Sequence, residues 1–305
     1  MPSASLFRRD IQLLDEGFIR YCTTSTTPLP TPGLIMDDEF TYQAELYLPG
    51  ELLSHIFRRL VHTACPSLTA ATILDQTMGW INWCRHLWRH GHPEALNPAD
   101  SLQKLLENGA LLTSFIFSVT MPYYHNGKGF DRYPEQHGPL LNHLKKRLDE
   151  GNQELHLLDM GCGSGEGTWE LLSLANEAGW TAQQVQCVGV TAATLEVWAA
   201  ENRCLPHLQS RTDSYRQRTD ILCSHGWQDA ICFQQGDVLQ EAPLNATFDI
   251  ILCNGLLGGP ALNQKILLDR ALQKLGTALR HRGLLCIGDR FHGGWHQTAT
   301  YRCRQ

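Results

Sequence analysis

The second half of the chain alternates short apolar runs with longer amphipathic segments. The runs are Leu155–Met160, Val185–Val190, Ala230–Gln235, Phe248–Cys253 and Gly283–Gly288. Between them, apolar residues recur at helical spacing in the segments 166–178, 192–202 and 264–279. Strands that alternate with helices indicate βαβ units, in which helices cover both faces of a parallel sheet. We therefore predict an α/β domain over residues 151–305.

The first half of the chain follows a helical spacing instead. Glu51–His62 places its large apolar residues on one helical face, and Ala71–Trp88 repeats the spacing with heavier side chains. The segment 138–151 predicts another helix, which ends at a glycine. Thr23–Gly33 is rich in Ser, Thr and Pro and predicts an extended linker. We expect residues 1–150 to form a mainly helical N-terminal domain, with its aromatic side chains in the core.

Composition narrows the functional classes. The chain has 305 residues, and no apolar run approaches the roughly 20 residues that cross a bilayer. No apolar stretch precedes the first charges, so we expect no secretory signal. The net charge of −6 argues against a general nucleic-acid surface, although it leaves room for a local basic patch. We expect a protein that binds neither a membrane nor nucleic acid.

The cysteines and histidines show no metal-binding pattern. The 11 cysteines are scattered, without a C-x-x-C pair, and their odd number fits a reducing cytoplasm better than a disulfide framework. The tightest histidine cluster, "RHGH" at Arg89–His92, has neither a cysteine pair nor an H-E-x-x-H helix to support it. We therefore expect a cytoplasmic protein without a metal site.

Four glycines fall within seven residues directly after the first predicted strand, in "LHLLDMGCGSGEGTWELL". Glycine permits positive φ and lets a ligand approach the backbone closely. Open α/β sheets bind ligands at the carboxyl ends of their strands. The dinucleotide pattern G-x-G-x-x-G fails here, because its third glycine would fall on Glu166 or Thr168. A phosphate-binding loop with Gly-Lys followed by Ser or Thr is also missing. The loop therefore predicts a ligand other than a pyrophosphate.

The stretch "LLDMGCGSG" resembles the first motif of class I S-adenosylmethionine-dependent methyltransferases, D-x-G-x-G-x-G. The resemblance implies a Rossmann-like, doubly wound, mostly parallel sheet of seven strands. It also implies cofactor contacts, which fall on Asp159, Gly161, Cys162, Gly163 and Gly165. S-adenosylmethionine carries a sulfonium and an ammonium group and no phosphate. An acidic rim at Asp159, with Glu166, would suit such a cation.

Later landmarks of the same family match in part. Thr191 stands where the family has an acid that holds the ribose diol, and a hydroxyl binds a diol more weakly than a carboxylate does. Asp237, with Val238 beside it, resembles the loop that binds the adenine amino group. Asn254 ends the fourth apolar run, where it either faces the methyl group or caps the next segment.

The order of landmarks is similar to that of the chemotaxis-receptor (CheR-type) methyltransferases, which place a helical domain before the catalytic one. Ser118–Phe130 resembles their T-x-F-F-R segment, with Tyr123 and Tyr124 at the phenylalanines and His125 at the arginine. Pro206–Trp227 is short and polar where that family inserts a small β-subdomain. The resemblance implies the architecture and the cofactor, and we do not extend it to the receptor-glutamate substrate.

These patterns predict an S-adenosylmethionine-dependent methyltransferase that acts on a protein carboxylate or a small molecule. His125 and Tyr124 are the candidate catalytic residues, and His125 has an ordinary pKa near neutrality. The alternative is a non-catalytic module that binds S-adenosylmethionine or S-adenosylhomocysteine, which the replacements at Thr191 and His125 favour. A nicotinamide-dependent oxidoreductase is a third hypothesis, and it predicts stabilisation by NAD.

Overall fold

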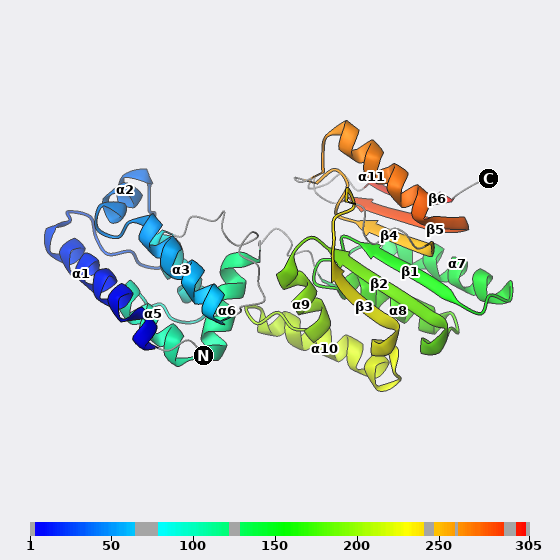
Figure 1. Cartoon of the computed structure of the whole chain (residues 1–305), viewed down its shortest axis with the longest axis horizontal. Helices are drawn as coiled ribbons and strands as arrows, with labels where there is room; N and C mark the ends of the chain where they lie inside the picture. The colour runs from blue at the N-terminus through cyan, green and yellow to red at the C-terminus, as the bar shows by residue number, and fades with distance from the viewer. Residues whose placement is uncertain are drawn as a thin grey trace. The chain divides into compact units, whose positions relative to one another are not determined.

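The computed structural model describes residues 4–64, 79–121, 129–240, 247–259, 262–289 and 297–302. It divides the chain into two compact units, Met1–Pro122 and Tyr123–Gln305 (Figure 1). This division comes earlier than residue 150, near which the sequence pattern changes from helical to alternating. The helix that precedes the sheet has the same apolar spacing as the helices of the first half. Each unit is therefore described by itself.

The first unit is helical in its described residues. Its elements are η1 (Ala4–Phe7), α1 (Arg8–Thr24), α2 (Asp38–Tyr47), α3 (Gly50–Ala64), α4 (Trp80–Arg89), α5 (Pro98–Glu107) and α6 (Gly109–Thr120). The helix predicted over 51–62 is confirmed as α3, which buries Leu53, Ile56 and Leu60. The described part of the helix predicted over 71–88 is α4, and residues 71–78 lie outside the described residues.

Aromatic side chains fill the centre of this unit, as the sequence predicts. The Tyr21 ring meets the Trp80 ring edge to face at 4.9 Å, and Trp83 lies 4.9 Å from Phe115. All four are buried, and the Trp80 indole N–H donates to the carbonyl of Leu96 at 2.7 Å. Buried aromatic pairs of this geometry add about 0.5–1.5 kcal/mol beyond the area that they remove from water.

The second unit is an α/β domain. Its elements are η4 (Pro134–Gln136), α7 (His137–Asp149), β1 (Leu155–Met160), α8 (Glu166–Glu177), η5 (Ala182–Gln184), β2 (Val185–Thr191), α9 (Thr194–Asn202), α10 (Gln209–Ser224), η6 (Trp227–Ala230), β3 (Ile231–Gln235), β4 (Phe248–Asn254), α11 (Lys265–Ala278), β5 (Leu279–Asp289) and β6 (Gln297–Arg302). All five apolar runs are confirmed as strands, and the three helical segments between them as α8, α9 and α11.

The strands form one sheet in the order β3-β2-β1-β4-β5-β6. β1 to β5 pair in parallel, and β6 runs antiparallel to β5. The described residues contain six strands, where the resemblance implied seven. β1 is central, because its Asp159 lies opposite Gly189 on β2 and Leu252 on β4. The loop that follows β1 therefore leaves the middle of the sheet.

Both faces of the sheet are covered, as predicted (Figure 1). Successive side chains of a strand point to opposite faces. Leu155 and Leu157 of β1 pack in a cluster that includes α7 and α8, whereas Leu158 and Met160 pack in a second cluster that includes α11. Each fully buried leucine contributes roughly 1.5–3 kcal/mol of hydrophobic stabilisation.

A buried carboxylate joins the amino ends of three neighbouring strands. Asp249, near the start of β4, is fully buried. It accepts hydrogen bonds from Arg147 of α7, from Arg280 of β5 at 2.8 Å, and from the backbone N–H of His156 of β1 at 2.9 Å. Two guanidinium groups and an amide compensate the cost of burying this charge. The amino edge of the sheet is thus held by one ionic centre.

No helix in the described part of the chain has the length and apolar character that a membrane crossing requires. Nine cysteines among the described residues carry free thiols. Cys187, Cys253 and Cys286 are buried on strands, where a thiol packs as a small hydrophobic group. Burial also raises the pKa of the Cys253 thiol.

Candidate ligand-binding site at the carboxyl edge of the sheet

The glycine loop, residues 161–165, connects β1 to α8 through three residues of positive φ. Gly161, Gly163 and Gly165 have φ values of 88°, 55° and 88°. The backbone N–H groups of Gly161 and Cys162 both donate to the carbonyl of Val190 on β2, at 2.8 and 2.9 Å. The loop is therefore fixed to the neighbouring strand, with a backbone that side chains other than glycine rarely adopt.

The three glycines differ in what surrounds them. A Cβ on Gly165 would lie 2.8 Å from the Tyr215 hydroxyl and 2.9 Å from the Phe233 ring, so this position packs helix against sheet. A Cβ on Gly161 would lie 3.2 Å from the Cβ of Leu256. A Cβ on Gly163 would meet no described atom within 4 Å. Of the three, Gly163 is the position at which a ligand could lie against bare backbone.

Asp159 lies beneath the loop. Its side chain is only 4% exposed, and it accepts a hydrogen bond from the Thr168 hydroxyl at 2.7 Å. Burial raises the pKa of Asp159 to about 6, and the hydrogen bond from Thr168 acts in the opposite direction. The carboxylate therefore anchors α8 to β1 in this structure. Cys162, also buried, directs its thiol to the carbonyl of Gly163.

Glu166, expected at an acidic rim, is buried and paired instead. It accepts hydrogen bonds from the Ser164 hydroxyl at 2.5 Å and from the Arg211 guanidinium at 2.7 Å. Its carboxylate stands in the first turn of α8, where the helix dipole favours negative charge. The first turn of α8, where a pyrophosphate would bind, thus carries a negative charge.

Helix α10 supports the glycine loop from outside the sheet, a contact that the sequence did not reveal. Tyr215 donates its hydroxyl to the carbonyl of Ser164 at 2.9 Å, and Arg211 of the same helix pairs with Glu166. The polar segment 206–227 therefore contains a helix that braces the loop. A signal for this role was the four-residue spacing of Arg211 and Tyr215 within an otherwise polar stretch.

A carboxylate from α9 lies against the end of β2, and the sequence pattern did not indicate it. Thr191 donates its hydroxyl to the carboxylate of Glu196, which lies in the first turn of α9 and is buried. A buried carboxylate thus lies against the Thr191 hydroxyl, five residues further along the chain. Its signal was the pattern T-x-x-x-x-E across the start of the helix.

The loop after β3 brings Asp237 to the same edge. Gly236 donates its N–H to the carbonyl of Thr191 at 2.9 Å, which ties this loop to the end of β2. Asp237 is half-buried, and its Oδ1 accepts the N–H of Leu239 at 2.9 Å. Val238 is buried in the cluster with Val190. The Asp237 backbone is thus held by a short turn, next to the Thr191 end of the sheet.

Asn254 ends β4, and its side chain is held by a second amide. Its Nδ2 donates to Oε1 of Gln136 at 2.8 Å, and its Oδ1 accepts from Nε2 of Gln136 at 2.9 Å. The next residue, Gly255, donates its N–H to the carbonyl of Gly288 at 2.7 Å. The segment that precedes α7 therefore lies across the ends of β4 and β5.

The candidate catalytic residues Tyr124 and His125, with Tyr123, lie outside the described residues. The described chain resumes at Gly129, where an added Cβ would lie 3.4 Å from the Glu166 carboxylate. The Phe130 ring packs on the Tyr215 ring at 5.5 Å. The segment directly after these candidates thus reaches the glycine loop.

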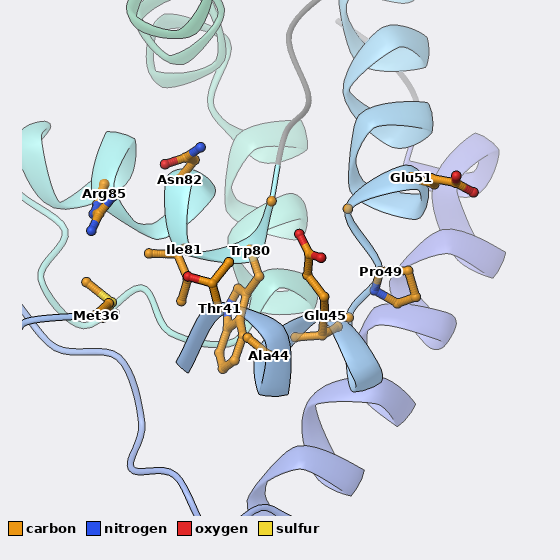
Figure 2. A pocket seen from close by; sticks show the side chains of 13 residues that line it. Met36, Thr41, Ala44, Glu45, Pro49, Glu51, Trp80, Ile81, Asn82 and Arg85 are labelled. Carbon is orange, nitrogen blue, oxygen red and sulfur yellow. The ribbon is translucent and has the colours of Figure 1, made fainter. Parts of the chain in front are cut away.

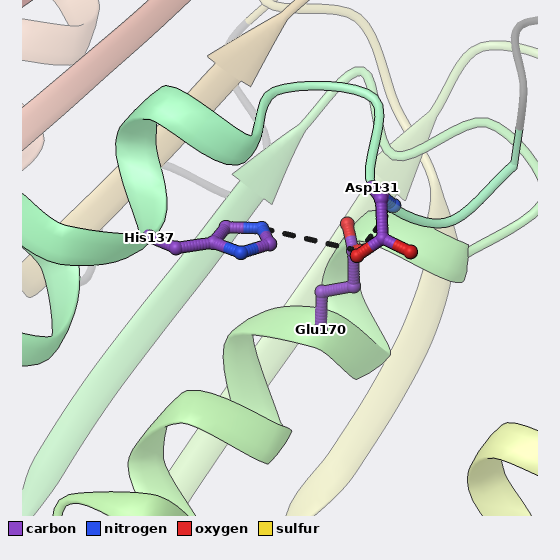
Figure 3. A group of neighbouring side chains, drawn as sticks. All are labelled: Asp131, His137 and Glu170. Carbon is purple, nitrogen blue, oxygen red and sulfur yellow. Dashed lines mark hydrogen bonds and ion pairs between the residues drawn. The ribbon is translucent and has the colours of Figure 1, made fainter.

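Two carboxylates and a histidine also cluster beside α8 (Figure 3). Asp131, His137 and Glu170 have potential ligand atoms within 4.8 Å of one another. However, both Asp131 oxygens accept hydrogen bonds from Arg218, and Glu170 accepts the Asp131 N–H. Burial raises the pKa of Glu170 to about 7. An arginine thus already provides the positive charge that a metal ion would bring.

A separate pocket lies within the first unit, between α2 and the starts of α3 and α4 (Figure 2). Its volume is about 590 Å³, within the range of about 300–1,000 Å³ that small-molecule sites occupy. Trp80 and Ile81 form part of its apolar wall, and Glu45 and Arg85 bring opposite charges to it. No motif in the sequence marks these residues as a binding site.

Comparison with known proteins gives similarity of structure alone. No family model and no curated protein matches the chain. A solved structure of the sugar N-methyltransferase KedS8 from Streptoalloteichus is 20% identical, with a TM-score of 0.36, over 56% of this chain and 53% of that one. The S-adenosylmethionine-bound amino pentose methyltransferase CalS10 from Micromonospora echinaspora is 16% identical, with a TM-score of 0.35, over 56% of each chain.

A solved structure of the [4+2]-cyclase SpnF is also similar in structure to this chain. It is 18% identical, with a TM-score of 0.31, over 50% of this chain and 44% of that one. The chain therefore spans about half the length of the structures that it matches. The neighbours include both methyltransferases and a cyclase, and at these identities and TM-scores they assign neither family nor activity. The closer resemblance to the chemotaxis-receptor enzymes gains no support from them and stays a prediction.

Proposed function

We propose that this chain is an S-adenosylmethionine-dependent methyltransferase whose acceptor is a small molecule or a protein carboxylate. One observation carries the proposal. At the carboxyl end of the central strand, Gly163 presents bare backbone with open space above it, while its neighbouring glycines are packed. A ligand in an open α/β sheet binds at this edge, and a backbone without Cβ atoms allows a flat nucleoside to lie against it.

The charges around the loop fit a cofactor that has no phosphate. Glu166 occupies the N-terminus of α8, and Arg211 is committed to it. Asp159 and Glu196 add two buried acidic groups near the loop. Such a setting disfavours a pyrophosphate and is compatible with a sulfonium and an ammonium group. A nicotinamide dinucleotide therefore fits this loop less well than S-adenosylmethionine does.

Each cofactor-facing residue has a role in this proposal. Gly161, Gly163 and Gly165 shape the crevice, and Cys162 packs beneath it. Glu196, oriented by Thr191, would accept the ribose hydroxyls, and Asp237 the adenine amino group, with Val238 against the ring. Asn254, fixed by Gln136, would stand beside the reacting carbon. Thr191 alone would bind the ribose diol weakly. The carboxylate of Glu196 would strengthen that binding, because a charged acceptor binds a diol more strongly than a hydroxyl does.

The bound cofactor would supply a methyl group that its sulfonium already activates for displacement. The chain would mainly align the acceptor with that carbon, and such positioning contributes about 7–11 kcal/mol. A carboxylate acceptor is ionised at neutral pH and needs no base. A hydroxyl or amine acceptor needs one, and His125 with Tyr124 would fill that role. His125→Ala should then slow turnover of a hydroxyl or amine acceptor and leave a carboxylate acceptor unaffected.

Calorimetry and thermal shift with S-adenosylhomocysteine, S-adenosylmethionine and NAD test the proposal. The two adenosyl ligands should raise the Tm of the full chain, and NAD should not. Gly163→Leu should lower affinity for S-adenosylhomocysteine by about tenfold or more, because the side chain fills the space that the ligand needs. Gly226→Leu is the matched control. It also has positive φ and open surroundings, but it lies in a turn after α10.

Unchanged affinity in Gly163→Leu, or stabilisation by NAD alone, would refute the proposed site. Turnover of methyl-labelled S-adenosylmethionine with candidate acceptors separates an enzyme from a binding module. Tight binding of S-adenosylhomocysteine without methyl transfer to any tested acceptor would favour the binding module.

A further inference from the structure

A half-buried arginine lies against the backbone at the end of β4. A Cβ placed on Gly255 would be 3.2 Å from Nη2 of Arg132 and 3.3 Å from its Nη1. Gly255 has a φ of 69°, which favours glycine, and the missing side chain leaves room for the guanidinium group. Arg132 belongs to the segment before η4, which is also fixed to this edge by Gln136 and Asn254.

Arg132 differs from the other half-buried arginines of its unit. The described part of the second unit contains five such arginines. Four of them pair with carboxylates: Arg147 and Arg280 with Asp249, Arg203 with Asp220, and Arg211 with Glu166. Arg132 makes no hydrogen bond or ion pair with any residue that the structure describes. Its contact is the ring of Tyr133, with the guanidinium carbon 5.4 Å from the ring centroid.

Partial burial of an unpaired cation is unfavourable, because the charge loses hydration without gaining a counter-charge. A protein tolerates such a group where a ligand supplies the missing charge. The planar guanidinium matches carboxylate and phosphate oxygens in a bidentate geometry. Arg132 is therefore suited to an anionic oxygen group that comes from outside the chain.

The position of Arg132 indicates which part of a ligand it meets. Gly255 is followed by Leu256, which contacts Gly161 of the glycine loop, and Gly255 is hydrogen-bonded to Gly288 of β5. Thr191 and Asp237 lie on the other side of that loop, at the ends of β2 and β3. A nucleoside over the glycine loop that uses those two residues leaves the side of β4 and β5 for the second substrate.

We propose that Arg132 binds the anionic group of the methyl acceptor, a carboxylate or a phosphate. The inference rests on the proposed function, because it needs a nucleoside in the glycine-loop crevice. It assigns the acceptor to the class of small organic acids or phosphate esters, with Arg132 as the residue that selects for negative charge. The Tyr133 ring lies beside the guanidinium group, which its π face attracts, and the group itself lies next to Gly255.

The test uses the full chain saturated with S-adenosylhomocysteine. Propionate and inorganic phosphate are titrated in separate experiments at constant ionic strength, with binding followed by NMR. We expect saturable binding of one of the two anions, and the arm that saturates identifies the group. Arg132→Gln should weaken that binding by about tenfold or more, and Arg132→Lys should restore part of it. Arg216→Gln, which changes an exposed arginine of α10, should have no effect.

Three results would overturn the inference. The first is that neither anion saturates the wild-type complex, and the second is that Arg132→Gln binds the anion as wild type does. The third is that Arg132→Gln loses affinity for S-adenosylhomocysteine but not for 5′-methylthioadenosine, which lacks the carboxylate; Arg132 would then hold the cofactor itself. Failure of wild type to bind S-adenosylhomocysteine would remove the proposed function as well, so the two failures are distinguishable.

Discussion

Replacing Gly165 by alanine should destabilise the protein more than the same change at Gly163. Both residues have positive φ, so both alanines carry backbone strain. Only the alanine at position 165 would also collide with neighbouring side chains. The added Cβ at Gly165 would lie 2.8 Å from the Cβ of Ala200, 2.8 Å from the Tyr215 hydroxyl and 2.9 Å from the Phe233 ring.

The magnitudes follow from these two contributions. A left-handed conformation costs a residue other than glycine about 1–2 kcal/mol, and the reduced freedom of the unfolded alanine variant returns about 0.4–1 kcal/mol. Overpacking a close-packed site costs a further 1–3 kcal/mol, roughly. Gly163→Ala should therefore lower the free energy of unfolding by about 1 kcal/mol, and Gly165→Ala by about 2–4 kcal/mol.

Urea unfolding followed by circular dichroism measures both changes, with Gly226→Ala as a further control for strain without collision. The midpoint should fall in the order wild type, Gly163→Ala, Gly165→Ala, with the slope unchanged. Equal losses at the two loop positions would refute the reasoning, because they would show that Gly165 is not packed as the structure has it.

Two further predictions concern buried acids. Asp249→Ala should cost about 3–5 kcal/mol of unfolding free energy, because Arg280 loses its carboxylate partner and Arg147 keeps only a longer contact with Glu150, at 3.7 Å. The exposed-pair control, Asp269→Ala, should stay within about 0.5 kcal/mol, and similar losses of the two variants in urea unfolding would contradict this prediction. Burial raises the pKa of Asp159 from 3.8 to about 6, so the folded state holds the proton more tightly than the unfolded state. The protonated carboxyl of Asp159 therefore stabilises the folded state below about pH 4. This contribution, roughly a few kcal/mol at most, is lost as the pH rises to about 6. Asp159→Asn should remove this loss of stability between about pH 4 and pH 6. Identical pH profiles of unfolding free energy for Asp159→Asn and wild type would contradict this prediction.

The sheet could be predicted because its strands are buried on both faces. Runs such as Leu155–Met160 and Phe248–Asn254 are apolar almost throughout, as central parallel strands are. The glycine loop was equally visible, since positive φ at three alternate positions strongly favours glycine at each of them. These features depend on residues close together in sequence, and a linear pattern is sufficient to indicate them.

The partners of charged groups could not be predicted in the same way. Glu166 and Arg211 are 45 residues apart, and only the packing of α10 brings them together. Glu166 was therefore expected at an open rim, although it is 4% exposed. Thr191 stood alone in the strand pattern, whereas the structure brings the carboxylate of Glu196 from the next helix to its hydroxyl. The segment of α10 was described only as short and polar, because few of its side chains, Tyr215 and Leu222 among them, are buried.

The ionic centre at Asp249 has a consequence for how this domain can change. It joins β1, β4, β5 and α7 at the opposite edge of the sheet from the glycine loop, so its side chains are separate from those at the carboxyl ends of the strands. Mutations around Gly255 and the end of β4 can therefore accumulate without disturbing the ion pairs of Asp249. A descendant of this chain could change the chemistry of that edge while its thermal stability remained that of its ancestor.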